Sequence, residues 1–175
     1  MKTSEINLQS KIREIPDFPK KGVSFKDITP LLEDADYFKE AVNLLAEKYQ
    51  NKKIRKIVAI DARGFLLASA LAYKLKVGLA IVRKKGKLPY KTVRKKYTLE
   101  YAANVLEMHT DAILPGQKVL LADDVLATGG TMKATIDLVK KLGGRITDIV
   151  FMVELKDLKG RQKLKGYQVK SLISF

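Results

Sequence analysis

The sequence predicts an α/β fold, with a central, mostly parallel β-sheet flanked by helices. Short unbroken apolar runs, such as 57–60, 119–122 and 149–153, alternate with helical patterns along the chain. Strands that are apolar on both faces are typical of parallel sheets, because helices cover both sides of such a sheet. The length of 175 residues, with 46% hydrophobic side chains, is expected to form a single domain over 1–175.

The individual elements follow from hydrophobic periodicity. Residues 36–49 have apolar side chains at helical spacing, and either Asp34 or Asp36 could cap this helix. The apolar run 64–75 predicts a second helix, and 131–142 a third. The expected strands are 57–60, 77–82, 97–108 (as one strand or two), 119–122, 149–153 and 167–173.

The chain is strongly basic, with a formal net charge of +15. This excess favours an anionic partner, such as a phosphorylated small molecule, nucleic acid or an anionic membrane surface, although a general enrichment in lysine would also explain it. Residues 83–96, RKKGKLPYKTVRKK, contain eight basic residues and no acidic one. Because Gly86 and Pro89 break helices, we expect a mobile cationic loop here.

Some classes of protein are excluded by what the sequence lacks. It has no cysteine, so neither disulfides nor thiolate metal sites can form. The polar start MKTSEINLQSK has no apolar signal core, and no apolar run approaches the roughly 20 residues that a membrane helix needs. We therefore expect a cytoplasmic protein without a membrane partner.

Three polar segments are each expected to follow a strand, and therefore to meet at one edge of the sheet. They are DARG at 61–64, the cationic loop from Arg83, and DDVLATGGT at 123–131. Ligands of open α/β sheets bind at the carboxyl ends of the strands. The sequence therefore predicts a ligand site at this edge.

The segment DDVLATGGT combines an anion-binding loop with two acids. The loop ATGGT at 127–131 can turn several backbone N–H groups toward a phosphate at a helix N-terminus, and without lysine it is not a Walker loop. Asp123 and Asp124 would repel a phosphate but accept hydrogen bonds from sugar hydroxyls, or help to bind Mg²⁺. This layout fits a ribose 5-phosphate; an ordinary strand–turn–helix with a capping threonine is the alternative.

This segment resembles the phosphoribosyl-pyrophosphate motif of the type I phosphoribosyltransferases. Further motifs are similar to those of the adenine phosphoribosyltransferases within that family, and the similarity extends from about residue 5 to the C-terminus. These motifs are IPDFPKKGVSFKDITPLL at 15–32, DARGF at 61–65, RKKGKLP at 83–89, LEY at 99–101 and LEMHTDAI at 106–113.

The resemblance implies a fold, a reaction and partners. The fold would be that of the type I phosphoribosyltransferases, with a small N-terminal base-recognition region over about 1–33 and a mobile lid. The reaction would transfer the 5-phosphoribosyl group of 5-phosphoribosyl 1-pyrophosphate (PRPP) to adenine, giving AMP and pyrophosphate. Mg²⁺ would be the cofactor, carried by PRPP without a certain protein ligand. A homodimer is implied, without a specific nucleic-acid partner.

The resemblance also assigns a partner to each candidate site residue. The ribose hydroxyls are expected at Asp123 and Asp124. The 5-phosphate is expected at Ala127, Thr128, Gly129, Gly130 and Thr131. Pyrophosphate is expected at Ala62, Arg63, Gly64, Arg83, Lys84 and Lys87. Adenine is expected at Val23, Phe25, Lys26 and Val125, with Phe25 stacking on the base.

Glu100 and Tyr101 lie on the expected lid. Glu100 could take the proton from adenine N9 or orient the base. The family commonly has glycine after this pair, whereas this chain has Ala102-Ala103, which restricts the backbone and puts the movement of the lid in doubt.

Several of these residues also have a purely structural explanation. Arg63 could form a surface salt bridge, Phe25 could be a core or lid residue, and Glu100 could belong to a surface strand pair. His109, the only histidine, is expected to form a structural hydrogen bond in a strand rather than to act as a base. The basic segment 156–172, KDLKGRQKLKGYQVKSL, is expected to be a solvated surface.

Two other functions stay open at this stage. A regulator or RNA-binding protein could keep this fold and sense PRPP without catalysis, as the high charge suggests; the presence of Arg63, Lys87 and Glu100 argues against it. A phosphoribosyltransferase for a 6-oxopurine would commonly use a lysine in the base pocket, whereas the motif GVSFKDI favours adenine.

Overall fold

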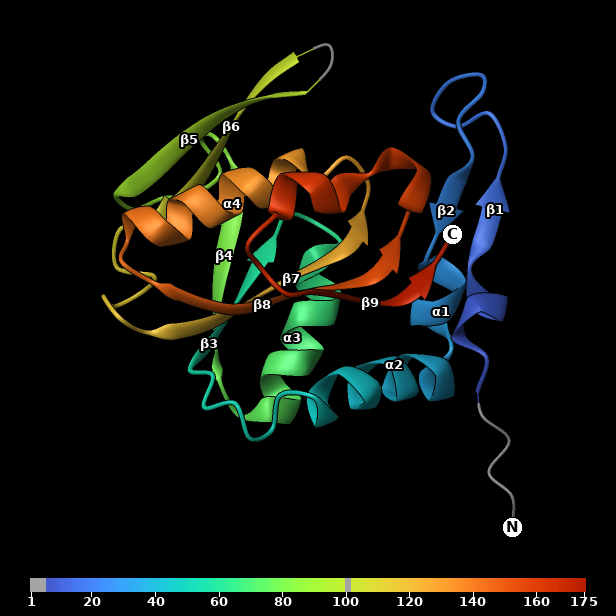
Figure 1. Cartoon of the computed structure of the whole chain (residues 1–175), viewed down its shortest axis with the longest axis horizontal. Coiled ribbons are helices and arrows are strands. Elements are labelled where there is room, and N and C mark those ends of the chain that lie inside the picture. Colours follow the sequence, from blue (N-terminus) through green and yellow to red (C-terminus); the bar gives the residue numbers. More distant parts are fainter. Residues whose placement is uncertain (1–5, 100–101) are drawn as a thin grey trace.

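Seven strands form the central sheet of the computed structural model, which describes residues 6–99 and 102–175. Their order across the sheet is β5-β6-β4-β3-β7-β8-β9 (Figure 1). Neighbouring strands from β4 to β9 are parallel, whereas β6 is antiparallel to both β4 and β5. The strands are β3 (Lys56–Ile60), β4 (Gly78–Lys84), β5 (Thr92–Leu99), β6 (Ala102–His109), β7 (Lys118–Leu126), β8 (Arg145–Glu154) and β9 (Val169–Ser174).

Helices cover both faces of this sheet, with α2 and α3 on one face and α4 on the other (Figure 1). A small antiparallel sheet of β1 (Arg13–Ile15) and β2 (Phe25–Asp27) stands beyond the β9 edge, and the β5–β6 hairpin projects at the opposite edge. The helices are α1 (Thr29–Glu33), α2 (Ala35–Glu47), α3 (Gly64–Leu75) and α4 (Gly130–Lys141), with 3-10 helices η1 (Leu8–Lys11), η2 (Lys156–Leu158) and η3 (Gly160–Leu164).

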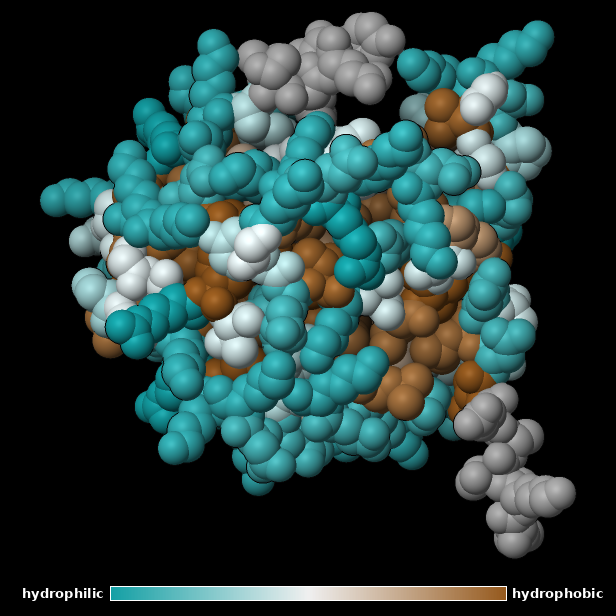
Figure 2. Space-filling model, viewed as in Figure 1, coloured by the Kyte–Doolittle hydropathy of each residue, from teal (hydrophilic) through white to brown (hydrophobic). Residues whose placement is uncertain are grey.

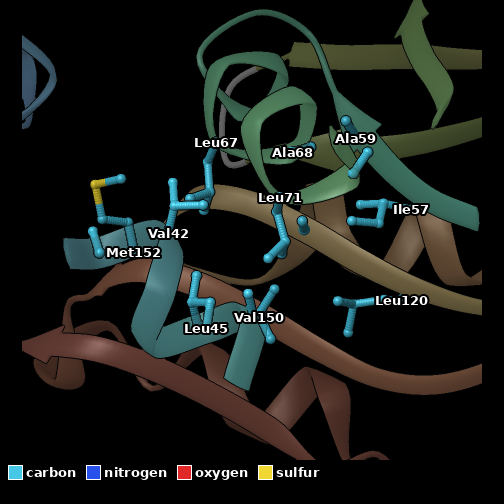
Figure 3. Packing of buried hydrophobic residues seen from close by; sticks show 14 of the residues in the cluster. Val42, Leu45, Ile57, Ala59, Leu67, Ala68, Leu71, Leu120, Val150 and Met152 are labelled. Carbon is cyan, nitrogen blue, oxygen red and sulfur yellow. The ribbon is translucent and has the colours of Figure 1, made fainter. Parts of the chain in front are cut away.

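Alternate residues of the central strands enter two apolar cores. On β3, Ile57 and Ala59 belong to the core beneath α2 and α3, while Val58 and Ile60 belong to the core beneath α4. Figure 3 shows the first of these cores, where side chains of both helices meet those of three strands. This two-sided burial explains why the strands are unbroken apolar runs in the sequence.

The predicted fold class is confirmed, and most of the elements lie where the periodicity places them. The segment 97–108 contributes to two strands, and the helix predicted at 64–75 has these bounds. In the view of Figure 2, hydrophilic side chains cover most of the surface. Among residues 6–99 and 102–175, no helix combines the length and apolarity needed to cross a membrane.

The cationic loop is shorter than predicted. Arg83 and Lys84 end β4, and residues 92–96 belong to β5. Two of the basic side chains in this strand have acidic partners: Arg94 pairs with Glu107 of β6 and Lys95 with Asp137 of α4. Charged side chains are common on edge strands such as β5, so a basic run does not exclude a strand.

The basic C-terminal segment also differs from the prediction of a solvated surface. It contains η2, η3 and most of β9, and both Gly160 and Leu164 are buried. Arg161 pairs with the buried Glu154 instead of pointing only into solvent. The sequence pattern missed this because the partners of the basic residues lie in other elements.

Replacing Asp34 by alanine is expected to lower Tm by about 2–4 °C. The Asp34 carboxylate caps α2 by accepting the N–H groups of Asp36 at 3.2 Å and Tyr37 at 3.3 Å. Calorimetry would measure the shift. Asp34→Asn keeps an acceptor oxygen and should stay near the wild-type Tm, so equal losses in the two variants would contradict a capping role.

Candidate active site

The candidate site lies where β3 and β7 run side by side in the middle of the sheet. From β3 the chain continues into α3 on one face, and from β7 into α4 on the other (Figure 1). Such a reversal of connection direction leaves a crevice at the carboxyl ends of the two strands. The segments 61–64 and 127–131 follow β3 and β7 at this point, as the sequence predicts.

The ATGGT loop borders a cavity of about 170 Å³ at the start of α4. Gly129 immediately precedes the helix. Its φ is +77°, a backbone conformation that residues with a Cβ rarely adopt. Exposed N–H groups at a helix N-terminus attract anions. All five residues predicted to bind the 5-phosphate line this cavity: Ala127, Thr128, Gly129, Gly130 and Thr131.

Asp123 and Asp124 stand between this cavity and a second one, near the end of β7. The strand continues to Leu126, so the two acids belong to it rather than following it. Asp123 Oδ1 accepts the N–H of Asp124 at 3.0 Å, and a Cβ at Gly64 would collide with this carboxylate. Gly64 is therefore needed where α3 passes the acidic pair.

The electrostatics of the two acids differ. Burial, followed by the neighbouring negative charge of Asp124, raises the pKa of Asp123 well above its usual value. Asp124 is only 7% exposed, and its Oδ2 lies 2.6 Å from Nε of Arg63. The pair is thus a negatively charged site whose repulsion is only partly neutralised.

Replacing Asp123 by asparagine is expected to raise Tm at neutral pH by about 2–4 °C. A carboxyl with a raised pKa disfavours the folded state wherever it must be charged, and asparagine removes that charge. The gain should shrink as the pH falls and be nearly lost at about pH 4, because Asp123 is then protonated in the folded chain and already about half protonated in the unfolded one.

Thermal melts of Asp123→Asn between pH 4 and 8, without ligands, would measure this pH dependence. Asp111→Asn removes an exposed carboxylate outside the crevice and should leave Tm unchanged. A lower Tm for Asp123→Asn at neutral pH would contradict the unfavourable charge at this position.

The second cavity, of about 300 Å³, has the size of a small-molecule pocket. It shares Val125 and Ala127 with the first cavity, so the two adjoin. Its lining residues are Val23, Ser24, Phe25, Lys26, Arg63, Asp124, Val125, Ala127, Leu155 and Leu158. All four residues predicted to bind adenine are among them; Leu155 and Leu158 were not predicted.

Arg63 connects the acidic pair with this second cavity. Its guanidinium lies 5.2 Å from the centre of the Phe25 ring and pairs with Asp124. Phe25 in turn packs edge-on against Phe18 at 5.2 Å. Arg63 does form a salt bridge, as in the alternative explanation, but its partner is buried and its side chain also lines the cavity.

The Lys26 side chain is directed away from the second cavity. Its Nζ pairs with Glu14 at 2.8 Å and lies 4.6 Å from the centre of the Phe175 ring. Glu14 and Phe175 border a neighbouring cavity, not this one. Only the inner part of Lys26 is thus available to a ligand here.

Two acidic side chains hold the end of β4 and the loop that follows it: Asp61 after β3, and Glu107 on β6. Arg83 Nε donates to Asp61 at 3.0 Å and its Nη1 to the Lys87 carbonyl at 3.2 Å. Buried Glu107 accepts the Gly86 N–H at 2.9 Å and pairs with Arg94 at 2.7 Å.

The guanidinium of Arg83 is therefore occupied in linking two loops, whereas Lys84 and Lys87 are exposed. All three, with Ala62, were predicted to bind pyrophosphate. Sequence reasoning missed Asp61 and Glu107, although both stand inside the motifs DARGF and LEMHTDAI.

Other predicted residues lie outside this arrangement. Glu100 and Tyr101 fall outside the described residues, between β5 and β6. His109 ends β6 and faces Tyr90 edge-on at 6.0 Å, and its Nε2 is buried without a partner among the described residues. The hydrogen bond expected for this histidine is therefore absent at Nε2. In the described part of the chain, no three His, Cys, Asp or Glu side chains group as a metal site.

Comparison with known proteins gives the relationship of the chain. Residues 31–174 match the family model of the phosphoribosyl transferase domain. The adenine phosphoribosyltransferase of Geobacter metallireducens is 56% identical over 168 residues, which cover 96% of this chain and 98% of that protein. The one of Thermotoga maritima is 53% identical over 171 residues, or 98% and 99%.

Comparison with solved structures supports the same relationship. The crystal structure of adenine phosphoribosyltransferase from Thermoanaerobacter pseudethanolicus has a TM-score of 0.93 and 52% identity, covering 96% of this chain and 98% of that one. The Giardia lamblia enzyme, complexed with 9-deazaadenine, has a TM-score of 0.91 and 36% identity, covering 96% of each chain. Given these matches over nearly the whole length and the adjoining cavities of the crevice, the chain belongs to the adenine phosphoribosyltransferases, within the phosphoribosyl transferase domain family.

Proposed function

We propose that this chain transfers the 5-phosphoribosyl group of PRPP to adenine, giving AMP and pyrophosphate in purine salvage. The observation that carries the proposal is the pair of adjoining cavities. One has a helix N-terminus for a phosphate, the other is lined mainly by apolar and aromatic groups, and Asp123 and Asp124 lie one on each. A nucleoside monophosphate has the same order: phosphate, sugar hydroxyls, base.

The reaction requires the protein to neutralise the leaving pyrophosphate and to shield the ribose ring from water, rather than to form covalent bonds with the substrates. Positive charge develops on the ribose ring and negative charge on pyrophosphate when the bond between them breaks. Arg63 is placed to move from Asp124 to a pyrophosphate oxygen, while Asp124 turns to a ribose hydroxyl. Lys84 and Lys87 would add positive charge, and the backbone at Ala62 and Gly64, on either side of Arg63, would border the pyrophosphate.

Mg²⁺ fits this site as a companion of PRPP. Carboxylate and phosphate oxygens are the ligands that it prefers, and the two neighbouring carboxylates supply the protein's share of the charge. When bound, the ion would neutralise part of the pyrophosphate charge. Asp123, Asp124 and Arg63 would hold the ribose and the leaving group in position beside the ion.

The base pocket favours adenine over a 6-oxopurine. A lysine that reads a 6-oxo group has to point its ammonium at the base, whereas Nζ of Lys26 is held by Glu14 outside the pocket. Phe25, Val23 and Val125 would clamp the faces of a flat apolar base. The relative from Saccharomyces cerevisiae, 36% identical with a TM-score of 0.89, was solved in complex with adenine, which supports this choice.

The remaining parts have proposed roles as well. The region of about 1–33, with β1 and β2, would recognise the base and belong to the single domain of 1–175. The β5–β6 hairpin would act as a lid that brings Glu100 and Tyr101 over the site and excludes water. Glu100 would take the N9 proton of adenine or orient the ring.

We further infer a cytoplasmic homodimer without a specific nucleic-acid partner. Tyr73 at the end of α3 is 88% exposed, and Leu66 and Leu79 on α3 and β4 are also exposed. A contiguous exposed apolar patch marks a protein interface, and these three side chains would form such a patch. Sedimentation of the purified protein would measure the oligomeric state, and a monomer at micromolar concentration would contradict the dimer.

A coupled assay for nucleotide formation tests the function. Purified protein, Mg²⁺ and PRPP would be combined with adenine, hypoxanthine, guanine or xanthine. Turnover with adenine alone is expected. Turnover with a 6-oxopurine would overturn the base assignment, and tight PRPP binding without turnover would favour the sensor hypothesis. Omission of Mg²⁺ should reduce the rate strongly.

A further inference from the structure

The segment after β8 lines one cavity of the proposed site and packs against the loop that borders the other. Leu155 and Leu158 line the base cavity, whereas Gly160 packs against the phosphate loop. The Leu155 N–H also donates to the Leu126 carbonyl at 2.9 Å, at the end of β7. Residues 155–160 therefore form a shared wall behind the base and the phosphate.

Gly160 meets the phosphate loop backbone to backbone. A Cβ at this position would collide with the Ala127 carbonyl and lie 2.8 Å from the Leu126 side chain. A Cβ on Gly129 would in turn lie 2.5 Å from the Gly160 carbonyl. The shape of the loop thus depends on where residues 155–160 lie.

Arg161 fixes the end of this wall. Its Nε and Nη2 donate to the two oxygens of Glu154 at 2.5 and 2.6 Å, and its Nη1 donates to the Val169 carbonyl at 2.7 Å. Ser171 donates to the same carboxylate at 2.8 Å. Glu154 is 4% exposed and directly precedes Leu155, so the bidentate pair closes residues 155–160 into a short loop tied to β8 and β9.

We propose that Arg161, acting through Glu154, is a positioning residue that holds residues 155–160 against the base cavity and the ATGGT loop, and thereby sets the affinity for phosphate and base together. The proposal rests on the proposed function of the two cavities. Neither side chain lines either cavity. Its effect would reach the ligand through Gly160 on the phosphate side and Leu158 on the base side.

The test compares Arg161→Ala, Arg161→Lys and the control Lys163→Ala, which removes a positive charge from the exposed surface of the same 3-10 helix. We expect Arg161→Ala to raise KM for both PRPP and adenine about tenfold, with kcat within about threefold of wild type. The Kd of AMP, measured by calorimetry without turnover, should rise about tenfold. Lysine cannot form the bidentate pair and should recover only part of the loss.

Two further variants separate the sides of the wall. Gly160→Ala should raise KM for PRPP while leaving KM for adenine within about threefold, and Leu158→Ala should do the reverse. If Arg161→Ala does not fold, the comparison of Arg161→Lys with wild type decides the matter. A lower Tm for the Arg161 variants, with unchanged KM values and AMP affinity, would show a purely structural pair and overturn the proposal.

Measurements on the wild-type protein distinguish failure of the proposed function from failure of the positioning role. If the wild-type protein neither binds AMP nor turns over adenine, the proposed function fails. If the wild type does both while Gly160→Ala and the Arg161 variants keep wild-type constants, the positioning role alone fails.

Discussion

Replacing Gly129 by alanine is expected to lower kcat/KM for PRPP by about 1000-fold. The residue has φ +77°, and left-handed backbone costs a residue with a Cβ about 1–2 kcal/mol. The new Cβ would also lie 2.5 Å from the Gly160 carbonyl, so the loop would have to move. Each lost hydrogen bond to a charged ligand costs about 1.5–3 kcal/mol, and about 4 kcal/mol in total corresponds to this factor.

Gly116→Ala is the matched control for this prediction. Gly116 has the same φ of +77°, but nothing lies within 4 Å of a Cβ built there. The control should lose stability from backbone strain while keeping kcat/KM within about threefold. Steady-state kinetics with varied PRPP would measure both, and a Gly129→Ala enzyme as active as the control would contradict the phosphate role of the loop.

The double variant Asp123→Asn/Asp124→Asn is expected to lose about 100- to 10,000-fold in kcat/KM. The two carboxylates would accept the ribose hydroxyls, and a hydrogen bond to a charged group contributes about 1.5–3 kcal/mol. Asparagine keeps the size of the side chain but removes its negative charge. The ion pair between Asp124 and Arg63 is therefore lost as well.

Stability and activity should separate in this double variant. Because the pKa of Asp123 is raised by burial and by Asp124, loss of both charges relieves a repulsion in the free protein. A folded double variant with less than one hundredth of wild-type activity would therefore locate the defect in the site. Activity above one tenth of wild type would show that neither carboxylate binds the ribose.

The ion pairs around the site could not be predicted from the sequence. The sequence shows that residues 83–96 are strongly basic. It does not show that Arg94 pairs with Glu107 or that Arg83 pairs with Asp61. The same holds for 156–172, whose charge predicted a solvated surface although Arg161 closes a loop on Glu154. Partners of this kind come from other elements of the sheet.

The sequence by itself determined the fold class and predicted that the ATGGT loop and the acidic pair lie together at the ends of the strands. These features depend on local chemistry: two-sided apolar strands, glycines at a helix start, and acids beside them. The tertiary structure alone decided that β7 extends through Asp123 and Asp124, since its ladder with β8 continues to Leu126 and Glu154. It also decided that Leu155 and Leu158 line the second cavity and that Gly160 packs against the ATGGT loop, because contacts across a sheet depend on strand order and register, which no local pattern specifies.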